Sequence, residues 1–300
     1  MTASISEKLM VADATAETFT TPRTRRRKRE IALWIAVAWL VIVLFHAVFA
    51  SWLPYVGKNP AQTSNGALAR IGLGRKAWFG GDQNGRDIFS YCVYGARASL
   101  LIGIATAFLG MLFGGGLGLV AGYYRGWVDN LITSVADIML SFPGLILLIA
   151  ITSFWGRDTY KIIVALTILS IAPLARLVRA NTIVYTQREF VTASRALGAK
   201  NSRILLREIL PNVTPVALSF SFLTIAIIIV AEGTLAFLGV GLNTKIASWG
   251  TMIVQGRSEI TRHIYHIVLM PSLVLVSTVL ALNVIGEKLR SRFDVRESAV

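Results

Sequence analysis

Apolar residues gather into six long runs along the chain, separated by shorter polar segments. The runs cover residues 31–52, 98–122, 131–155, 162–178, 216–241 and 265–286. An α-helix rises about 1.5 Å per residue, so each run is close to the ~20 residues needed to cross ~30 Å of hydrocarbon. A bilayer core has no water to satisfy free backbone groups, and the pattern therefore predicts an all-α membrane protein with six transmembrane helices.

Composition agrees with a membrane protein. Of the 300 residues, 54% are hydrophobic and 15% are charged, against about 25% charged in a soluble domain. The net charge of +14 would suggest a nucleic-acid partner in a soluble protein. In a membrane protein the same excess belongs on the cytoplasmic side, so we expect contact with membrane lipid and not with nucleic acid. The single cysteine, Cys92, cannot form an internal disulfide.

The distribution of Lys and Arg predicts the orientation and the domain boundaries. Residues 1–30 are polar and end in a basic cluster, which predicts a disordered cytoplasmic tail; the alternative is that this cluster binds anionic lipid or nucleic acid. The larger share of Lys and Arg between the runs lies on the side of both termini, so both are predicted cytoplasmic. Residues 31–96 then hold the first transmembrane helix and an extracytoplasmic loop, expected to be an ordered loop or small cap. Residues 97–287 form a five-helix core and 288–300 a cytoplasmic tail.

Glycines repeat every four residues in the second run, at Gly110, Gly114, Gly118 and Gly122. This spacing places them on one helix face, where the missing side chains let another helix approach closely. A phosphate-binding loop is the alternative, but no Gly-Lys-Ser/Thr follows. Because the sequence has no Walker motif, active transport by this protein requires ATP hydrolysis by another chain.

Two acidic residues lie inside predicted spans, Asp137 in the third and Glu232 in the fifth. A charge at the bilayer centre costs at least ~2.5–3.5 kcal/mol, so these side chains should face a bundle interior or water. They are candidates for the translocation pathway, and a buried structural hydrogen bond is an equal alternative. The spacing of the residues indicates no metal-ligand cluster and no nucleophile–base set. We therefore expect no catalytic and no metal site.

A long polar stretch at 188–215 separates the fourth and fifth runs. Apolar positions at Phe190, Ala193 and Leu197, and then at Ile204, Leu205 and Ile209, predict two short helices that each have one apolar face. Gly198 interrupts them as a C-cap glycine would, Asn201 or Ser202 can cap the second helix, and Pro211 and Pro215 mark the entry to the fifth span. Such a hairpin would either lie on anionic lipid or dock on a cytoplasmic partner.

The segment TASRALGAKNSRILLREILPN at 192–212 resembles the EAA loop of permease subunits in binding-protein-dependent ABC importers. It departs from the family pattern at Thr192, Ser194 and Glu208. Further segments resemble the C-type permeases of the dipeptide, oligopeptide and nickel importers: GDQNGRD at 81–87, YGARASL at 94–100, AGYYRGWVD at 121–129, DIMLSFP at 137–143, EGTLAFLGVG at 232–241 and SWG at 248–250.

This resemblance implies an ABC importer type I permease fold in the bacterial plasma (inner) membrane, acting by alternating access. It implies a heterodimer with a B-type permease, two cytoplasmic ATPases that bind ATP and Mg, and an extracytoplasmic substrate-binding protein; this chain holds no cofactor. The coupling loop would be 188–211, with its apex at 197–199. The residues implied in ATPase coupling are Ala193, Arg195, Ala196, Leu197, Gly198, Ala199 and Arg203.

Three alternatives stay open at this point. The cargo is expected to be an oligopeptide or dipeptide, with nickel or glutathione as the alternatives. A secondary transporter or channel would work without ATPase subunits, and a membrane anchor would show no substrate-dependent change in ATPase activity. Co-purification of ATPases with the chain distinguishes the importer from the transporter.

Overall fold

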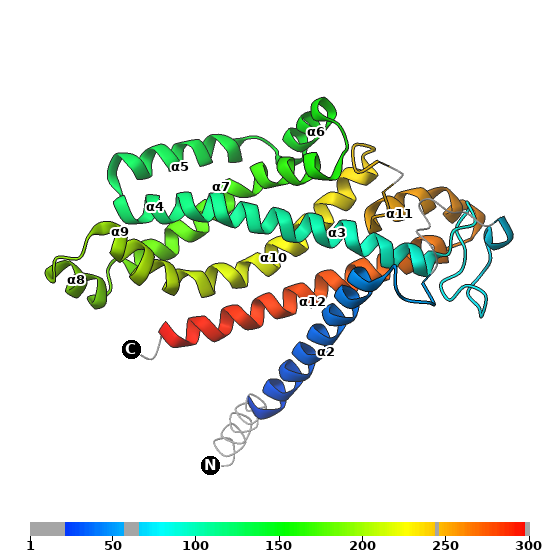
Figure 1. Cartoon of the computed structure of the whole chain (residues 1–300), viewed down its shortest axis with the longest axis horizontal. Helices are drawn as coiled ribbons and strands as arrows, with labels where there is room; N and C mark the ends of the chain where they lie inside the picture. Colours follow the sequence, from blue (N-terminus) through cyan, green and yellow to red (C-terminus); the bar gives the residue numbers. More distant parts are fainter. Residues whose placement is uncertain (1–21, 57–65, 244–245, 298–300) are drawn as a thin grey trace, which may run out of the picture.

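The computed structural model describes residues 22–56, 66–243 and 246–297, and almost all of these are helical (Figure 1). The first part holds α2 (Pro22–Phe49), η1 (Gly66–Leu68), α3 (Ile88–Gly110), the π-helical η2 (Met111–Gly115) and α4 (Gly116–Tyr124). The middle holds α5 (Gly126–Ser141), α6 (Gly144–Trp155), α7 (Thr159–Tyr185), α8 (Glu189–Ala196), α9 (Asn201–Arg203) and the π-helical η3 (Ile204–Ile209). The last part holds α10 (Leu210–Phe237), α11 (Trp249–Gly256), the 3-10 helix η4 (Arg257–Arg262) and α12 (His266–Glu297).

The long helices lie roughly along one direction and leave two distinct ends (Figure 1). At one end are α8 and α9, near the C-terminal end of α12; we call this the hairpin end. At the other are α11, η4 and the described part of the segment between α2 and α3; we call this the cap end. Within the described residues, five helical runs are long and apolar enough to cross a membrane, and the α5–α6 pair makes a sixth. The predicted all-α membrane fold is confirmed.

The predicted span over 131–155 is bent in the structure. The structure has two helices, α5 and α6, that meet at 84°. The cause is Pro143, since a proline excludes the residue before it from helical backbone angles. Phe142 is extended, with φ −84° and ψ 137°, and this ends α5. A count of apolar residues cannot detect the bend, because both arms are apolar.

Other helix limits also differ from the prediction. The second span begins at Ile88 rather than at 98, because the Asp87 side chain accepts a hydrogen bond from the Ser90 amide and caps the helix. The second helix of the hairpin does not stop at Pro211 and Pro215 but runs from Asn201 through to Phe237. Pro211 lies just after the π-helical η3, within this continuous helical run.

The predicted terminal tails are only partly described. Residues 1–21, most of the predicted disordered tail, and residues 298–300 lie outside the described residues. Residues 22–30 are already part of α2, and α12 extends to Glu297. Over these stretches the structure therefore has helix where we expected a tail.

The glycine repeat lies against α7. A Cβ atom added at Gly118 would be 2.3 Å from the carbonyl oxygen of Ala175, and one at Gly114 would be 2.5 Å from that of Ile171. A Cβ atom added at Gly110 would lie 3.0 Å from the Ser170 side chain of α7, and one at Gly122 would lie 2.7 Å from the Thr182 side chain. The backbone of α3, η2 and α4 therefore approaches α7 more closely than any side chain would permit.

Residues 66–87, before α3, form a cap on the turn between α11 and α12. Arg70 donates two hydrogen bonds to Glu259 of η4, at 2.9 and 3.1 Å. Arg86 donates to the Gln255 side chain at 3.1 Å, and Gln83 donates to the Gln255 carbonyl at 2.9 Å. These bonds join residues more than 160 positions apart and attach the cap to both α11 and η4.

We expect the Arg70–Glu259 pair to make the cap acid-sensitive. The hydrogen bonds from Arg70 hold the pKa of the Glu259 carboxyl below its ordinary value of 4.5. A lowered folded-state pKa gives a stabilisation that is present above pH 4.5 and is lost as the pH falls through the folded value. Protease cleavage in 66–87 should therefore accelerate on acidification in the native protein. Glu259→Gln should already be cleaved faster at neutral pH and change less on acidification; equal pH profiles would contradict the prediction.

Candidate coupling hairpin and buried glutamate

The polar stretch between α7 and α10 folds into a helical hairpin, α8–α9. Gly198 adopts φ +76°, a left-handed conformation that costs most other residues about 1–2 kcal/mol. Its amide donates to the Arg195 carbonyl at 2.9 Å, and the Ala199 amide donates to the Ser194 carbonyl at 3.1 Å. These two bonds form a Schellman motif, which ends α8 and turns the chain. The prediction that Gly198 ends the first helix is confirmed, whereas α9 follows Lys200 with no side-chain cap from Asn201 or Ser202.

The apolar positions predicted on one face of α8 are exposed in the structure. Phe190 is 37% exposed and Leu197 is 87% exposed, while Val191, between the predicted positions, is fully buried. In the second arm Ile204, Leu205 and Ile209 are buried, as their spacing predicted. Val191 is the buried residue of α8, a helix of eight residues. The consequence is that the tip of the hairpin presents Leu197 to the surroundings.

The hairpin is held firmly on the transmembrane helices. Val191, Ile204 and Ile209 pack with Leu119 and Tyr123 of α4 in one buried apolar cluster. The Tyr123 hydroxyl also donates to the Asn201 side chain at 2.9 Å. The hairpin therefore contacts α4 directly, and α4 in turn lies against α7 through the glycine contacts.

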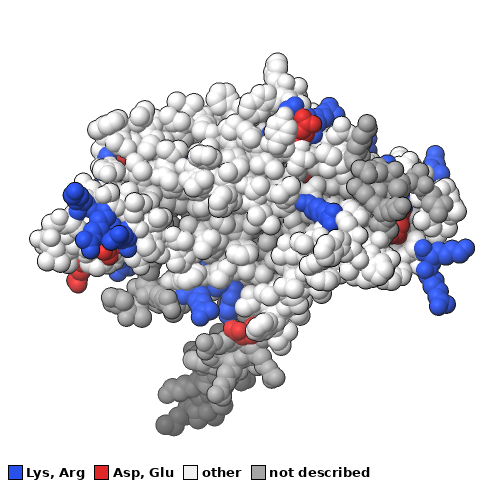
Figure 2. Space-filling view, in the orientation of Figure 1, with Lys and Arg blue, Asp and Glu red and all other residues white. Residues whose placement is uncertain are grey.

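Basic residues surround the hairpin. Figure 2 shows Lys and Arg gathered over α8 and α9, and a mostly uncharged surface between the two ends of the molecule. Of the residues predicted for coupling, Ala199 is half-buried and the remainder are exposed: Ala193, Arg195, Ala196, Leu197, Gly198 and Arg203. Arg195 lies over the ring of Tyr123, 5.6 Å from its centre. The predicted coupling residues are thus brought together on one accessible surface.

Asp137 and Glu232 occupy different environments, and the structure does not bring them together. Asp137 lies on α5 with a half-exposed side chain, and it forms an ion pair with Arg176 of α7, which is exposed to the same degree. A second ion pair of the same two helices joins Asp129 to Arg179, with one contact of 2.7 Å. Asp137 is therefore accessible from outside the chain, while its charge is balanced by an arginine.

Glu232 is completely buried. Its carboxylate accepts a hydrogen bond of 2.8 Å from the Ser248 hydroxyl, which precedes α11. Ser248 in turn caps α11 through a reciprocal pair of bonds with Thr251. Glu232 therefore links α10 to the start of α11, and in this conformation no part of it reaches the surface.

The neighbourhood of Glu232 is built from segments far apart in the sequence. Trp249 is fully buried; its indole N–H donates to the Cys92 carbonyl at 3.0 Å, and its amide donates to Ser99 at 3.2 Å. A Cβ atom at Gly250 would lie 2.6 Å from the Cα atom of Gly233. The backbones of α10 and α11 thus touch beside Glu232, and α3 closes the third side.

Comparison with known proteins agrees with this architecture. Residues 114–297, which include α4, the hairpin, Glu232 and α11, match the family described as the inner membrane component of binding-protein-dependent transport systems. The chain belongs to this family. It is a multi-pass permease of the bacterial inner membrane.

Curated relatives cover nearly the whole permease. It is 36% identical over 276 residues to the glutathione transport system permease protein GsiD of Pectobacterium atrosepticum, covering 91% of each chain. It is 37% identical over 271 residues to GsiD of Escherichia coli, covering 90% of this chain and 88% of the relative. A solved structure of the inward-facing MetNI methionine ABC transporter matches with a TM-score of 0.57 and 19% identity, over 68% of the permease and 96% of that chain. The permease therefore has the fold of an ABC importer subunit.

Sequence reasoning missed the residues that surround Glu232. Ser99, Ser248 and Trp249 fall inside segments that resemble the family, but nothing in their spacing predicts that they meet. Arg97 was missed as well: it lies on α3 of the permease and donates to the Val48 carbonyl at 3.0 Å, near the end of α2. The available signal was that these residues lie in segments that resemble the family. That resemblance does not predict which residues they contact.

Proposed function

We propose that the permease forms one half of the translocation pathway of an ATP-driven importer. The other half is a B-type permease, two cytoplasmic ATPases bind ATP and Mg, and an extracytoplasmic protein delivers the substrate to the cap end. In this arrangement the hairpin end faces the cytoplasm. Membership of a binding-protein-dependent family supports the extracytoplasmic protein. The fold shared with an ABC transporter subunit supports the ATPases.

The observation that carries the proposal is Leu197 at the hairpin tip. A leucine that is 87% exposed beyond the last turn of an amphipathic helix is an anchor for a groove on a partner. Exposed arginines surround it, at Arg195 and Arg203, and they can pair with acidic groups at the rim of such a groove. The residues that hold the hairpin from behind are buried, so the tip is rigid before docking.

The movement that follows ATP binding would pass through the hairpin. When two ATPases close, each carries its docked hairpin along; Tyr123 then moves α4, and α4 moves α7 because their backbones touch. Rigid coupling of this kind lets two permeases rock between inward and outward openings. Asp137 on the accessible side of α5 is the better candidate for the pathway, whereas Glu232 acts as an anchor for α11.

Short peptides are the proposed cargo, and glutathione, itself a tripeptide, belongs to this class. Two curated relatives carry the name of glutathione permeases. Uptake of labelled peptides of two to five residues and of glutathione, with the complete importer in proteoliposomes, tests the assignment. Transport of nickel with none of these peptides would overturn it.

Leu197→Glu is expected to abolish peptide uptake while the permease still folds and reaches the membrane. The side chain has few contacts within the chain, so stability should not change, whereas a charge inserted into an apolar groove opposes docking. Loss of an interface anchor costs about 2 kcal/mol or more, about a thirtyfold loss of affinity. The measurements are co-purification of the ATPases with the permease and substrate-stimulated ATP hydrolysis in proteoliposomes.

Thr192→Glu is the matched control for this substitution. It adds the same charge to the exposed surface of α8, at a position where the resembling family carries Glu, and should leave ATPase binding unchanged. If Leu197→Glu retains its ATPases, or if both variants lose them equally, Leu197 is not the docking anchor. Uptake by a permease that co-purifies with no ATPase at all would overturn the importer itself.

A further inference from the structure

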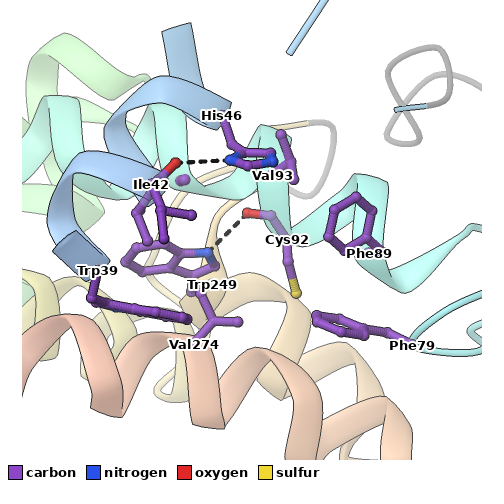
Figure 3. Close-up of a pocket in the computed structure, with 11 residues that line it drawn as sticks. Trp39, Ile42, His46, Phe79, Phe89, Cys92, Val93, Trp249 and Val274 are labelled. Carbon is purple, nitrogen blue, oxygen red and sulfur yellow. Dashed lines mark hydrogen bonds between the residues drawn. The ribbon is translucent and has the colours of Figure 1, made fainter. Parts of the chain in front are cut away.

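A cavity of about 170 Å³ lies at the cap end, between α2 and the remainder of the permease (Figure 3). Trp39, Ile42 and His46 of α2 line one side, Cys92 of α3 lines the second, and Val274 of α12 lines the third. All three helices belong to runs that are long and apolar enough to span the membrane. The cavity is therefore set among membrane-spanning helices, away from the coupling hairpin.

The polar atoms around the cavity are already hydrogen-bonded. The indole N–H of Trp249 donates to the Cys92 carbonyl at 3.0 Å, and that of Trp39 donates to Thr278 at 3.1 Å. One ring nitrogen of His46 is 2.8 Å from the Ile42 carbonyl oxygen, and the other is 3.2 Å from the Tyr55 hydroxyl. Water needs two to four polar partners to occupy a buried site. The cavity therefore favours an apolar occupant.

The cavity borders the lipid-facing side of α2. Ile42, which lines it, is 50% exposed, and its neighbours Val41 and Phe45 are 58% and 48% exposed. In a bilayer these side chains contact hydrocarbon, so the nearest mobile apolar molecules are lipid chains. Drug-sized ligands occupy pockets of about 300–1,000 Å³, so the space suits a slender chain rather than a bulky molecule.

Side chains of the kind found at a membrane–water boundary lie next to His46, which lines the cavity. His46 and Tyr55 lie there in contact, Tyr55 stacks on Trp78 at 5.9 Å between ring centres, and Trp52 is 83% exposed. Tyr and Trp concentrate at the depth of the lipid headgroups. A phospholipid with its headgroup at this level would place an acyl chain alongside α2, beside the cavity.

We propose that this cavity binds one acyl chain of a membrane phospholipid from the cap-end leaflet. The acyl chain fills a space that would otherwise leave the cavity-facing atoms of Trp39, Cys92 and Val274 without dispersion contacts on that side. It thereby completes the packing of α2 against α3 and α12. The ligand is an acyl chain, and the headgroup contributes only by its position beside His46 and Tyr55.

The test uses the complete importer in nanodiscs made with a phosphatidylcholine that carries a photoreactive diazirine at the end of one acyl chain. After irradiation, adducts are mapped by mass spectrometry. We expect adducts on cavity-lining residues such as Phe89, Cys92 and Trp39, at higher yield than on the lipid-facing Leu273 and Leu280 of α12. Yields on the lining no higher than on those exposed leucines would overturn the proposal.

Val274→Phe places a larger side chain in the cavity, and Val276→Phe is its matched control, the same change on the 49% exposed side of α12. The first should reduce adducts on the lining several-fold, and the second should leave them unchanged. If Val274→Phe does not fold, Ala96→Leu narrows the same cavity from α3. Equal labelling of the lining in the native protein and in a folded cavity-filling variant would overturn the proposal.

Discussion

Gly118→Ala is expected to lower the melting temperature of the permease by several degrees and to reduce its yield in the membrane. The added methyl group would lie 2.3 Å from the Ala175 carbonyl oxygen and 2.9 Å from the Arg179 amide nitrogen, both backbone atoms of α7. Neither can rotate away, so α4 and α7 must separate along their length. Overpacking of this kind costs about 1–3 kcal/mol, and here it also weakens the route from hairpin to α7. Thermal unfolding followed by fluorescence-detected size exclusion measures the change.

Gly116→Ala is the matched control. It lies two residues away on the same helix, and a Cβ atom there has nothing within 4 Å. Its backbone is already helical, at φ −59° and ψ −48°, so alanine should be neutral or stabilise by up to about 1 kcal/mol through its higher helix propensity. The two substitutions therefore have opposite expected signs. Equal melting temperatures for both variants would mean that close packing on α7 is not what the glycine repeat provides.

The glycine repeat shows what the sequence of a membrane protein can disclose. Spacing alone placed four glycines on one helix face, and the length of each apolar run located most spans. Both properties are local, because they depend only on residues within a few turns. Which helix the glycines meet is not local: the partner, α7, lies about sixty residues further along and has no complementary feature that spacing would reveal.

The errors have equally physical causes. Pro143 bends the third span by restricting Phe142, an effect that an apolar count over twenty residues averages away. In α8, an eight-residue helix, periodicity located the apolar face but did not predict that Val191 packs against α4, because that contact depends on where α4 lies. Asp87 starts α3 earlier than the apolar run, since a cap needs one side chain and no hydrophobicity.

Glu232 is the residue for which sequence left two hypotheses in balance. Burial and the bond to Ser248 favour an anchor between α10 and α11 over a group in the pathway. We expect Glu232→Ala to destabilise the permease by about 2–5 kcal/mol, because it leaves a cavity and removes the acceptor of a buried hydroxyl. Glu232→Gln keeps the shape and the acceptor oxygen, and should retain stability and most of the uptake.

The control for truncation is Ile227→Ala, on the same helix but 67% exposed, where loss of the side chain creates no cavity. Thermal unfolding and peptide uptake at several pH values distinguish the two roles. An anchor predicts that Glu232→Gln has the native pH profile at reduced or equal rate. A pathway group predicts native stability for Glu232→Gln with lost or pH-shifted uptake, because an amide cannot carry the charge or a transferable proton. That second pattern would contradict the hypothesis that Glu232 is a structural anchor. It would instead support a role for Glu232 in the translocation pathway, together with Asp137.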